Sequence, residues 1–307
     1  MRWTRTINVA AVFAAAVLGL TACGGGDSNP APAAQSKGGA PIVVASFNFT
    51  DSQILAELYA NALESKGYPV ERKLNLGSRE LIYPELKKGS LQFIPEYQGA
   101  AIQTGFAGVP EKTPEAEHEQ LKKLLEPSGV GLLNFAPAQN KNAFIVKADL
   151  AKEKGLKTLS DLKKLDKVVM GGGPECAQRI PCFKGLQDVY KLTNATFQAV
   201  QEAGPRVEGL KSGSITVITV DSVNPLVGDP AYAELQDDLG IVPTENIVPA
   251  VAKKVIDERG ADFATVVNAV SAKLTTEELR TLNKRVDSDG EQAADVAKDW
   301  LKSKALI

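Results

Sequence analysis

The feature that most constrains the fold is an alternation of short apolar runs with amphipathic segments along 307 residues. Residues 42–46 (IVVAS) form a continuous apolar run, which is typical of a strand buried on both faces. In the segment that follows, Thr50 and Gln53 fit a helix capping box, and apolar residues at 54–63 share one helical face. Gly67 ends that helix. A repeated strand–helix order predicts an α/β fold with a mostly parallel sheet.

The same reading predicts the remaining elements. We expect strands at 70–76, 91–94, 131–135, 143–146, 167–170, 215–220 and 247–251, and helices at 78–88, 159–165, 183–191, 206–211, 263–273, 276–286 and 291–302. No period of 20–50 residues repeats, which excludes a solenoid. Two extended, proline-containing segments, 136–140 and 241–249, are candidate crossings between two domains. If both are hinges, the first domain is discontinuous in sequence.

The N-terminus predicts export. Arg2 and Arg5 precede an apolar run at 7–20 and small residues, as in a secretory signal peptide, here residues 1–22. The run falls short of the roughly 20 apolar residues that an uncleaved membrane anchor needs. Cys23, directly after Leu-Thr-Ala, resembles the lipobox of lipoproteins. That resemblance implies a diacylated Cys23 thiol, a mature chain that begins there and an extracytoplasmic location on the membrane.

The segment after this cysteine reads GGGDSNPAPAAQSKGGA and contains no aromatic or branched apolar residue. Such a composition cannot bury a core, so we predict a flexible tether over 23–40. Two cysteines remain, Cys176 and Cys182. In an oxidising compartment such a pair usually closes a disulfide. A metal or redox pair is the weaker alternative, because the spacing is not Cys-x-x-Cys.

The sequence lacks the residues that several classes of function require. The mature chain is mildly acidic and has no basic stripe, so we expect no nucleic-acid partner. There is no phosphate-binding loop, and the glycines at 171–173 do not fit a dinucleotide site. The single histidine, His118, lies in a polar helix start where we expect it to be solvated, so neither a catalytic triad nor a histidine-based zinc site is supported. We therefore expect a binding protein without cofactor or metal, while a carboxylate pair of the glycosidase kind stays open.

Several segments together resemble the substrate-binding proteins of quaternary-amine ABC importers, the ProX-like glycine betaine, carnitine and choline receptors. The runs that carry the resemblance are LNLGSRE at 74–80, YPELKKG at 83–89, PEYQG at 95–99, PAQ at 137–139 with NAF at 142–144, GGPEC at 172–176 with the following arginine and cysteine, and NIVP at 246–249. The likeness spans residue 42 to the C-terminus. It implies a two-lobed periplasmic-binding-protein fold of type II with two hinge crossings. Lobe 1 would comprise 41–137 and 246–307, and lobe 2 would comprise 138–245.

The resemblance also implies a ligand site between the lobes. In the family an aromatic cage holds a trimethylammonium head by cation–π attraction, and an arginine holds the carboxylate. Tyr97 falls on a cage tyrosine, and Arg179 falls on the arginine. Phe47, with Asn48 after it, falls where some members place a polar ligand contact. Three further positions line up with cage aromatics but are not aromatic here: Asn142, Asp221 and Glu245.

These departures leave two ligand classes open. The first is a compatible solute or quaternary amine of the glycine betaine, choline and carnitine class, bound as the hinge closes. The second is a more polar solute, such as a polyol or amine, because a carboxylate that replaces a ring needs hydrogen-bond donors. Structural roles also stay open: a helix cap for Asp221, a salt bridge for Arg179 and core packing for Tyr97.

The partners implied are the small solute, an ABC permease subunit and the membrane through the lipid, with the receptor itself a monomer. A surface-anchored enzyme on the same scaffold is a less favoured reading, and so is a surface protein whose cleft engages a partner or glycan instead of a transported solute.

Overall fold

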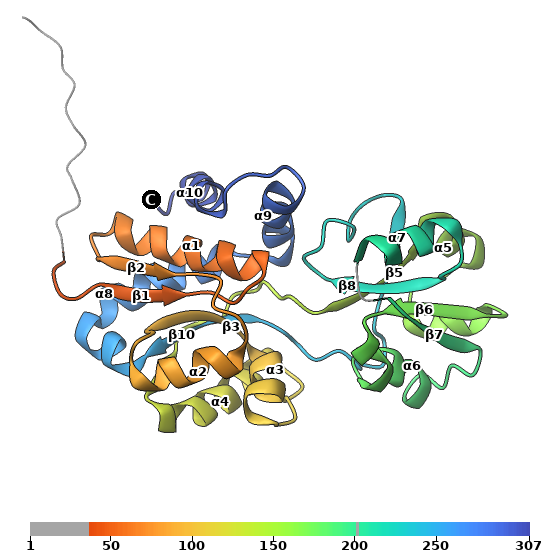
Figure 1. Ribbon diagram of the computed structural model, residues 1–307, viewed down its shortest axis with the longest axis horizontal. Helices are drawn as coiled ribbons and strands as arrows, with labels where there is room; N and C mark the ends of the chain where they lie inside the picture. The colour runs from red at the N-terminus through yellow and green to blue at the C-terminus, as the bar shows by residue number, and fades with distance from the viewer. Residues whose placement is uncertain (1–36, 201–202) are drawn as a thin grey trace, which may run out of the picture. The chain divides into compact units, whose positions relative to one another are not determined.

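A computed structural model describes residues 37–200 and 203–307 (Figure 1). The predicted signal peptide 1–22, the predicted lipid site Cys23 and the first part of the tether lie outside the described residues. Two five-stranded sheets organise the rest of the chain. We call the part built on the first sheet lobe 1 (β1–β4 and β10 with α1–α4 and α8–α10), and the part built on the second sheet lobe 2 (β5–β9 with α5–α7).

The sheet of lobe 1 has the strand order β2-β1-β3-β10-β4. Its strands are β1 (Ile42–Ala45), β2 (Val70–Lys73), β3 (Phe93–Tyr97), β4 (Val130–Leu132) and β10 (Ile247–Ala252). β1 pairs in parallel with β2 and β3, whereas β10 runs antiparallel to β3 and β4. The central strands β3 and β10 are buried along their whole length, which suits the wholly apolar sequence of β10.

Helices cover both faces of this sheet (Figure 1). On one side α1 packs against α8, α9 and α10, and on the other lie α2, α3 and α4. The bounds are α1 (Thr50–Ser65), α2 (Arg79–Lys88), α3 (Gln98–Ala100) with the π-helical turn η1 (Ala101–Gly105), α4 (Pro114–Leu125) with the short η2 (Glu126–Ser128), α8 (Lys253–Lys273), α9 (Thr276–Asp287) and α10 (Ala293–Ser303). The apolar face of α1 forms much of the core, because its leucines, isoleucine and Tyr59 are fully buried.

Lobe 2 repeats the layered plan with the strand order β7-β6-β8-β5-β9. Its strands are β5 (Asn142–Lys147), β6 (Val168–Gly172), β7 (Ala195–Ala199), β8 (Val217–Asp221) and β9 (Tyr232–Leu235). Its helical segments are α5 (Ala148–Lys154), η3 (Leu159–Lys164), η4 (Pro174–Gln178), α6 (Phe183–Asp188) and α7 (Ala203–Ser212). The predicted α/β class with two lobes is confirmed, because helices alternate with strands along the chain and the strands form two separate sheets.

The expectation of mostly parallel sheets was wrong. Half of the strand pairings are antiparallel, and all of these involve β10 in lobe 1 or β5 in lobe 2. Both strands directly follow a crossing between the sheets, and each runs opposite to the other strands of its sheet. The βαβ units within each lobe remain parallel, as local connections dictate.

Some local predictions also need correction. Thr50 does not cap α1: it is the first helical residue, and its hydroxyl donates to Asp287 Oδ1 at 2.6 Å. The predicted helix at 159–165 is the 3₁₀ segment η3, and the strands β7 and β9 were not predicted. The end of the predicted tether is held on lobe 1, because Lys37 pairs with Asp262 at 3.0 Å and Arg259 donates to the Ala40 carbonyl at 2.7 Å.

Two chain segments connect the sheets, one before β5 and one before β10. They meet as neighbours: Gln139 and Asn246 form an antiparallel bridge, and the amide of Asn140 donates to the Glu245 carbonyl at 3.1 Å. The predicted lobe limits at 137/138 and 245/246 fall inside these segments and stay predictions. Within the described residues, no helix combines the length and apolarity needed to span a bilayer.

Candidate ligand-binding site

Two aromatic rings of lobe 1 face a cavity. Phe49, just before α1, is partly exposed, and its ring lies 5.9 Å from that of Tyr97 at the end of β3. Phe47 also stacks on Phe49, with centroids 5.7 Å apart and planes inclined by 7°. Phe47 is itself buried and does not line the cavity. Its ring instead lies under the Arg79 guanidinium, at 4.9 Å from the centroid.

A buried hydrogen-bond network fixes the tyrosine. The Tyr97 hydroxyl donates to Asp51 Oδ2 at 2.5 Å, and the Asn140 amide donates to the same oxygen at 3.0 Å. Burial raises the pKa of Asp51 to about 6, while the Tyr97 hydrogen bond opposes that rise. Asn140 lies in the first crossing between the lobes, so this network ties α1, β3 and the hinge segment together.

A second network in lobe 1 centres on a fully buried carboxylate, Glu96. The Arg79 guanidinium holds it with two hydrogen bonds of 2.9 and 2.7 Å, and the Tyr83 hydroxyl donates at 2.9 Å. The backbone amide of Tyr97 donates to it as well, at 2.7 Å. Burial works to lower the pKa of Arg79, but the charge of Glu96 outweighs it and the pKa is raised. Arg79 therefore lines the cavity with its charge already compensated.

Glu245, at the second crossing, is nine-tenths buried against lobe 1. It accepts a hydrogen bond from the Ala100 amide at 2.8 Å. Burial raises the pKa of Glu245 to about 8, against the lowering effect of that amide and of Arg79. Its neighbour Thr244 donates to the buried Glu117 at 2.5 Å, and burial raises the pKa of Glu117 to about 7. Both carboxyls lie where the second crossing meets α3 and α4.

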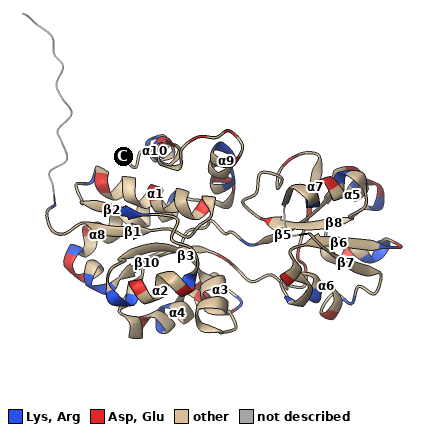
Figure 2. Cartoon of the chain, in the orientation of Figure 1, with Lys and Arg blue, Asp and Glu red and all other residues tan. Residues whose placement is uncertain are grey.

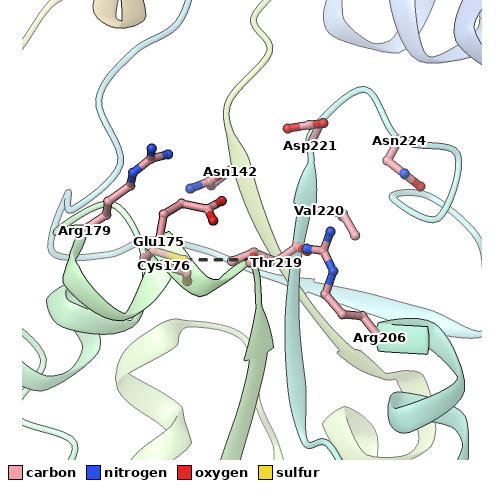
Figure 3. Close-up of a pocket in the computed structure, with 11 residues that line it drawn as sticks. Asn142, Glu175, Cys176, Arg179, Arg206, Thr219, Val220, Asp221 and Asn224 are labelled. Atoms are coloured by element: carbon pink, nitrogen blue, oxygen red, sulfur yellow. Dashed lines mark hydrogen bonds between the residues drawn. A yellow bond between two sulfur atoms is a disulfide. The ribbon is translucent and has the colours of Figure 1, made fainter. Parts of the chain in front are cut away.

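The lobe 2 side of the site begins with a small disulfide loop. Cys176 and Cys182 are bonded, which confirms the predicted pair, and Arg179 lies at the centre of the loop (Figure 3). The loop is compact: the amide of Cys182 donates to the Arg179 carbonyl at 3.1 Å. Among the described residues, no hydrogen bond or ion pair engages the Arg179 side chain, which is exposed into the cavity. The salt-bridge alternative for this arginine therefore finds no support.

Polar groups line the rest of a 260 Å³ pocket in lobe 2. Asp221 ends β8 beside Asn142, its partner across the β-ladder. Glu175 projects from η4, and its carboxylate and that of Asp221 face the open space around Asn142 (Figure 3). Although Asp221 is exposed by surface area, desolvation by the surrounding protein raises its pKa, and the charge of Arg206 opposes this. Within the described residues the Asp221 carboxylate makes no capping bond, and its backbone carbonyl accepts a hydrogen bond from the Asn224 amide.

A larger cavity of about 580 Å³ collects residues of both lobes. Five predicted site residues line it: Tyr97, Arg179, Asn142, Asp221 and Glu245. The two others do not, since Phe47 is buried behind Phe49 and Asn48 is exposed outside the lining. Tyr97 combines the two roles considered for it, being 4% exposed in the core and part of the cavity wall.

Several lining or supporting residues were missed, namely Phe49, Asp51, Arg79 and Glu175. Arg79 and Glu175 lie inside the sequence runs that carry the family likeness, which was the signal available for them. Phe49 stands two positions after Phe47, so a shift of two residues along an extended segment separates the predicted contact from the observed one.

Other chemistry finds little support in the described chain. His118 is half-buried and not solvated, with its Nδ1 2.9 Å from Gln98 Oε1 and its ring against Phe135, and burial lowers its pKa. No group of three metal-ligating side chains is arranged for an ion within the described ranges. Positive and negative residues are interspersed along the helices of both lobes (Figure 2).

Residues 40–303 match the family model of the substrate-binding domain of ABC-type glycine betaine transport systems, OpuAC. The chain belongs to this family. A relative from Pseudomonas aeruginosa, named glycine-betaine-binding protein, is 26% identical over 84% of this chain and 86% of its own length. The glycine betaine-binding protein YehZ of Escherichia coli is 24% identical over 86% and 90%.

The fold has close counterparts among solved structures. One described as a glycine betaine/carnitine/choline ABC transporter superposes with a TM-score of 0.78 at 21% identity, covering 86% of this chain and 99% of that one. The protein is thus an extracytoplasmic solute-binding protein of an ABC importer. The relatives it matches are transport receptors and not enzymes.

Proposed function

We propose that the solute is a small amine of the glycine betaine, choline and carnitine class, bound in the cavity between Tyr97 and Arg179 as the hinge closes. One observation carries this proposal: the cavity combines two aromatic rings, from Phe49 and Tyr97, with a guanidinium that has no partner in the described protein. Rings attract a cationic head, and a guanidinium binds a carboxylate in bidentate fashion. The names of the relatives support the same class.

Calorimetric titration of the purified protein with glycine betaine, choline and carnitine tests the proposal. At least one should bind saturably with one site per chain and raise the melting temperature as its concentration increases. Arg179→Ala should weaken any carboxylate-bearing ligand, whereas Lys163→Ala, an exposed cation of lobe 2, should not. Absence of saturable binding by all three solutes and by their less methylated analogues would overturn the proposal.

The lobe limits, 41–137 with 246–307 and 138–245, and the role of the two crossings as hinges belong to this proposal. We also propose that the receptor releases its solute chemically unchanged. Incubation with the bound solute followed by mass spectrometry should recover only the starting mass, and a new product would point to catalysis.

The anchor is a separate part of the proposal. We propose that Cys23 carries a lipid, that residues 1–22 are removed, and that the monomeric receptor is tethered beside its permease. An alkyne fatty acid fed to expressing cells should label the wild-type chain and not Cys23→Ser, with the wild type in the membrane fraction. Labelling that persists in Cys23→Ser would contradict the assignment, and light scattering that reports dimers would contradict the monomer.

A further inference from the structure

Three charged side chains of lobe 2 face its pocket without a hydrogen-bond partner in the described chain: Glu175, Arg179 and Asp221. They come from different elements, namely η4, the loop after it and the end of β8. In the view of Figure 3, Asn142 lies between the Arg179 guanidinium and the Asp221 carboxylate, with the Glu175 carboxylate beside it. The Asn142 amide is already engaged, because it donates to the Pro181 carbonyl at 2.9 Å.

The same pocket contains no aromatic ring among the described residues that line it. This wall therefore cannot attract a cation through a ring face, as the Phe49 and Tyr97 pair of lobe 1 can. What it offers a cationic head is hydrogen-bond acceptance by two carboxylates. A fully methylated nitrogen has no N–H to donate, so it would leave these acceptors desolvated and unsatisfied, which is costly.

We infer that the solute is a zwitterion whose cationic nitrogen keeps at least one N–H, that Glu175 and Asp221 accept hydrogen bonds from it, and that Arg179 binds its carboxylate. The inference rests on the proposed function and changes one feature of it: the preferred solutes are the less methylated relatives of that class, with a secondary or tertiary amine in place of the trimethylammonium group. Glu175 and Asp221 then act as the residues that select against full methylation. The rings of lobe 1 contact the remaining methyl groups.

A methylation series at a constant carboxylate tests the inference: sarcosine and N,N-dimethylglycine against glycine betaine, each titrated into the purified protein by calorimetry. The second series, 4-(dimethylamino)butyrate against its trimethylated counterpart, covers a longer spacing between the charges. Since a hydrogen bond to a charged group contributes a factor of about ten or more, an N–H member should bind at least about tenfold tighter than its trimethylated partner. Tightest binding by the trimethylated member in both series overturns the inference and leaves the proposed function standing. No binding by any member, nor by choline or carnitine, overturns both.

Two variants that remove a charge test whether Glu175 and Asp221 produce the preference for N–H ligands. Glu175→Gln and Asp221→Asn keep the size of each side chain and remove its charge. Each should weaken an N–H ligand by about tenfold while changing the affinity for the trimethylated partner much less, so that the ratio between them shrinks. Glu234→Gln and Asp166→Asn are matched controls on exposed positions of lobe 2 and should leave the ratio unchanged. An undiminished ratio in both pocket variants would overturn the assignment.

Discussion

The two lobes present charge to the cavity in opposite ways. In lobe 1 each charged group near the cavity is buried and bonded to protein: Arg79 to Glu96, Asp51 to Tyr97 and Asn140. In lobe 2 the side chains of Arg179, Glu175 and Asp221 are exposed and make no hydrogen bond within the described residues. The charged groups of lobe 1 are therefore preorganised by their bonds to protein, whereas those of lobe 2 are available to bind the ligand.

The largest expected effect is on the free energy of unfolding, which should respond differently to the loss of an arginine from each lobe. Arg79→Ala leaves Glu96 fully buried without its cation, which should lower the free energy of unfolding by about 3–5 kcal/mol. Arg179→Ala removes an exposed and unpartnered guanidinium and should change it by less than about 0.5 kcal/mol. Urea denaturation of the ligand-free variants measures both. Equal losses would break the comparison.

The next effect is the pH dependence of lobe 1. The folded chain keeps a proton on Glu245 up to about pH 8, on Glu117 up to about pH 7 and on Asp51 up to about pH 6, whereas the unfolded chain releases each near pH 4. Unfolding therefore releases protons in this window, so these groups stabilise the fold fully below about pH 4 and progressively less as pH rises to 8.

Glu245→Gln isolates that contribution. Its free energy of unfolding should fall less between pH 6 and 9 than that of the wild type, by on the order of 2–3 kcal/mol, since one pKa unit corresponds to about 1.4 kcal/mol. Denaturation curves at a series of pH values provide the measurement. Parallel stability profiles of variant and wild type would refute the buried proton at Glu245.

Ligand affinity should depend strongly on the Arg179 guanidinium of lobe 2, although this group contributes little to the stability of the fold. Arg179→Ala removes the free guanidinium that the proposal assigns to the ligand carboxylate, and should weaken binding by about 2 kcal/mol, or some thirtyfold. Lys163→Ala serves as the matched control on an exposed lobe 2 cation. Unchanged affinity in calorimetric titration of Arg179→Ala would mean that this guanidinium does not meet the ligand.

The smallest effect concerns the disulfide that shapes the Arg179 loop of lobe 2. Replacing Cys176 and Cys182 together by serine opens a loop of six positions and should cost about 2 kcal/mol of stability by the loop-entropy estimate. Affinity should fall as well, because Arg179 loses the constraint on its loop. The reduced wild-type protein should behave like the double variant. A variant with unaltered affinity would show that the backbone bonds of the loop suffice.

Local sequence patterns predicted most of the fold, whereas the five predicted residues that line the cavity came from the family resemblance. The strands at 42–46 and 247–251 and the α1 helix follow from apolar periodicity, and the disulfide follows from compartment and cysteine count. Strand direction was missed, because β5 and β10 take theirs from long crossings that periodicity does not register.

The site residues that were missed also depend on contacts between residues far apart in the sequence. Arg79 is held at the cavity by Glu96, seventeen positions away, and Asp51 supports the site through Tyr97, forty-six positions away. Tyr97 and Arg179 were found because they fall on short runs that resemble the family, whereas Phe47 and Asn48 depended on placing a single side chain within an extended segment.

The most direct test of the difference between the lobes is a structure of the complex with the member of the methylation series that binds most tightly. We predict that the ligand carboxylate lies within hydrogen-bond distance of Arg179 and its N–H within reach of Glu175 or Asp221. The Arg79–Glu96 and Asp51–Tyr97 bonds should be unchanged. A ligand bound while Arg179, Glu175 and Asp221 remain without partners, or one that displaces the lobe 1 pairs, would contradict the account.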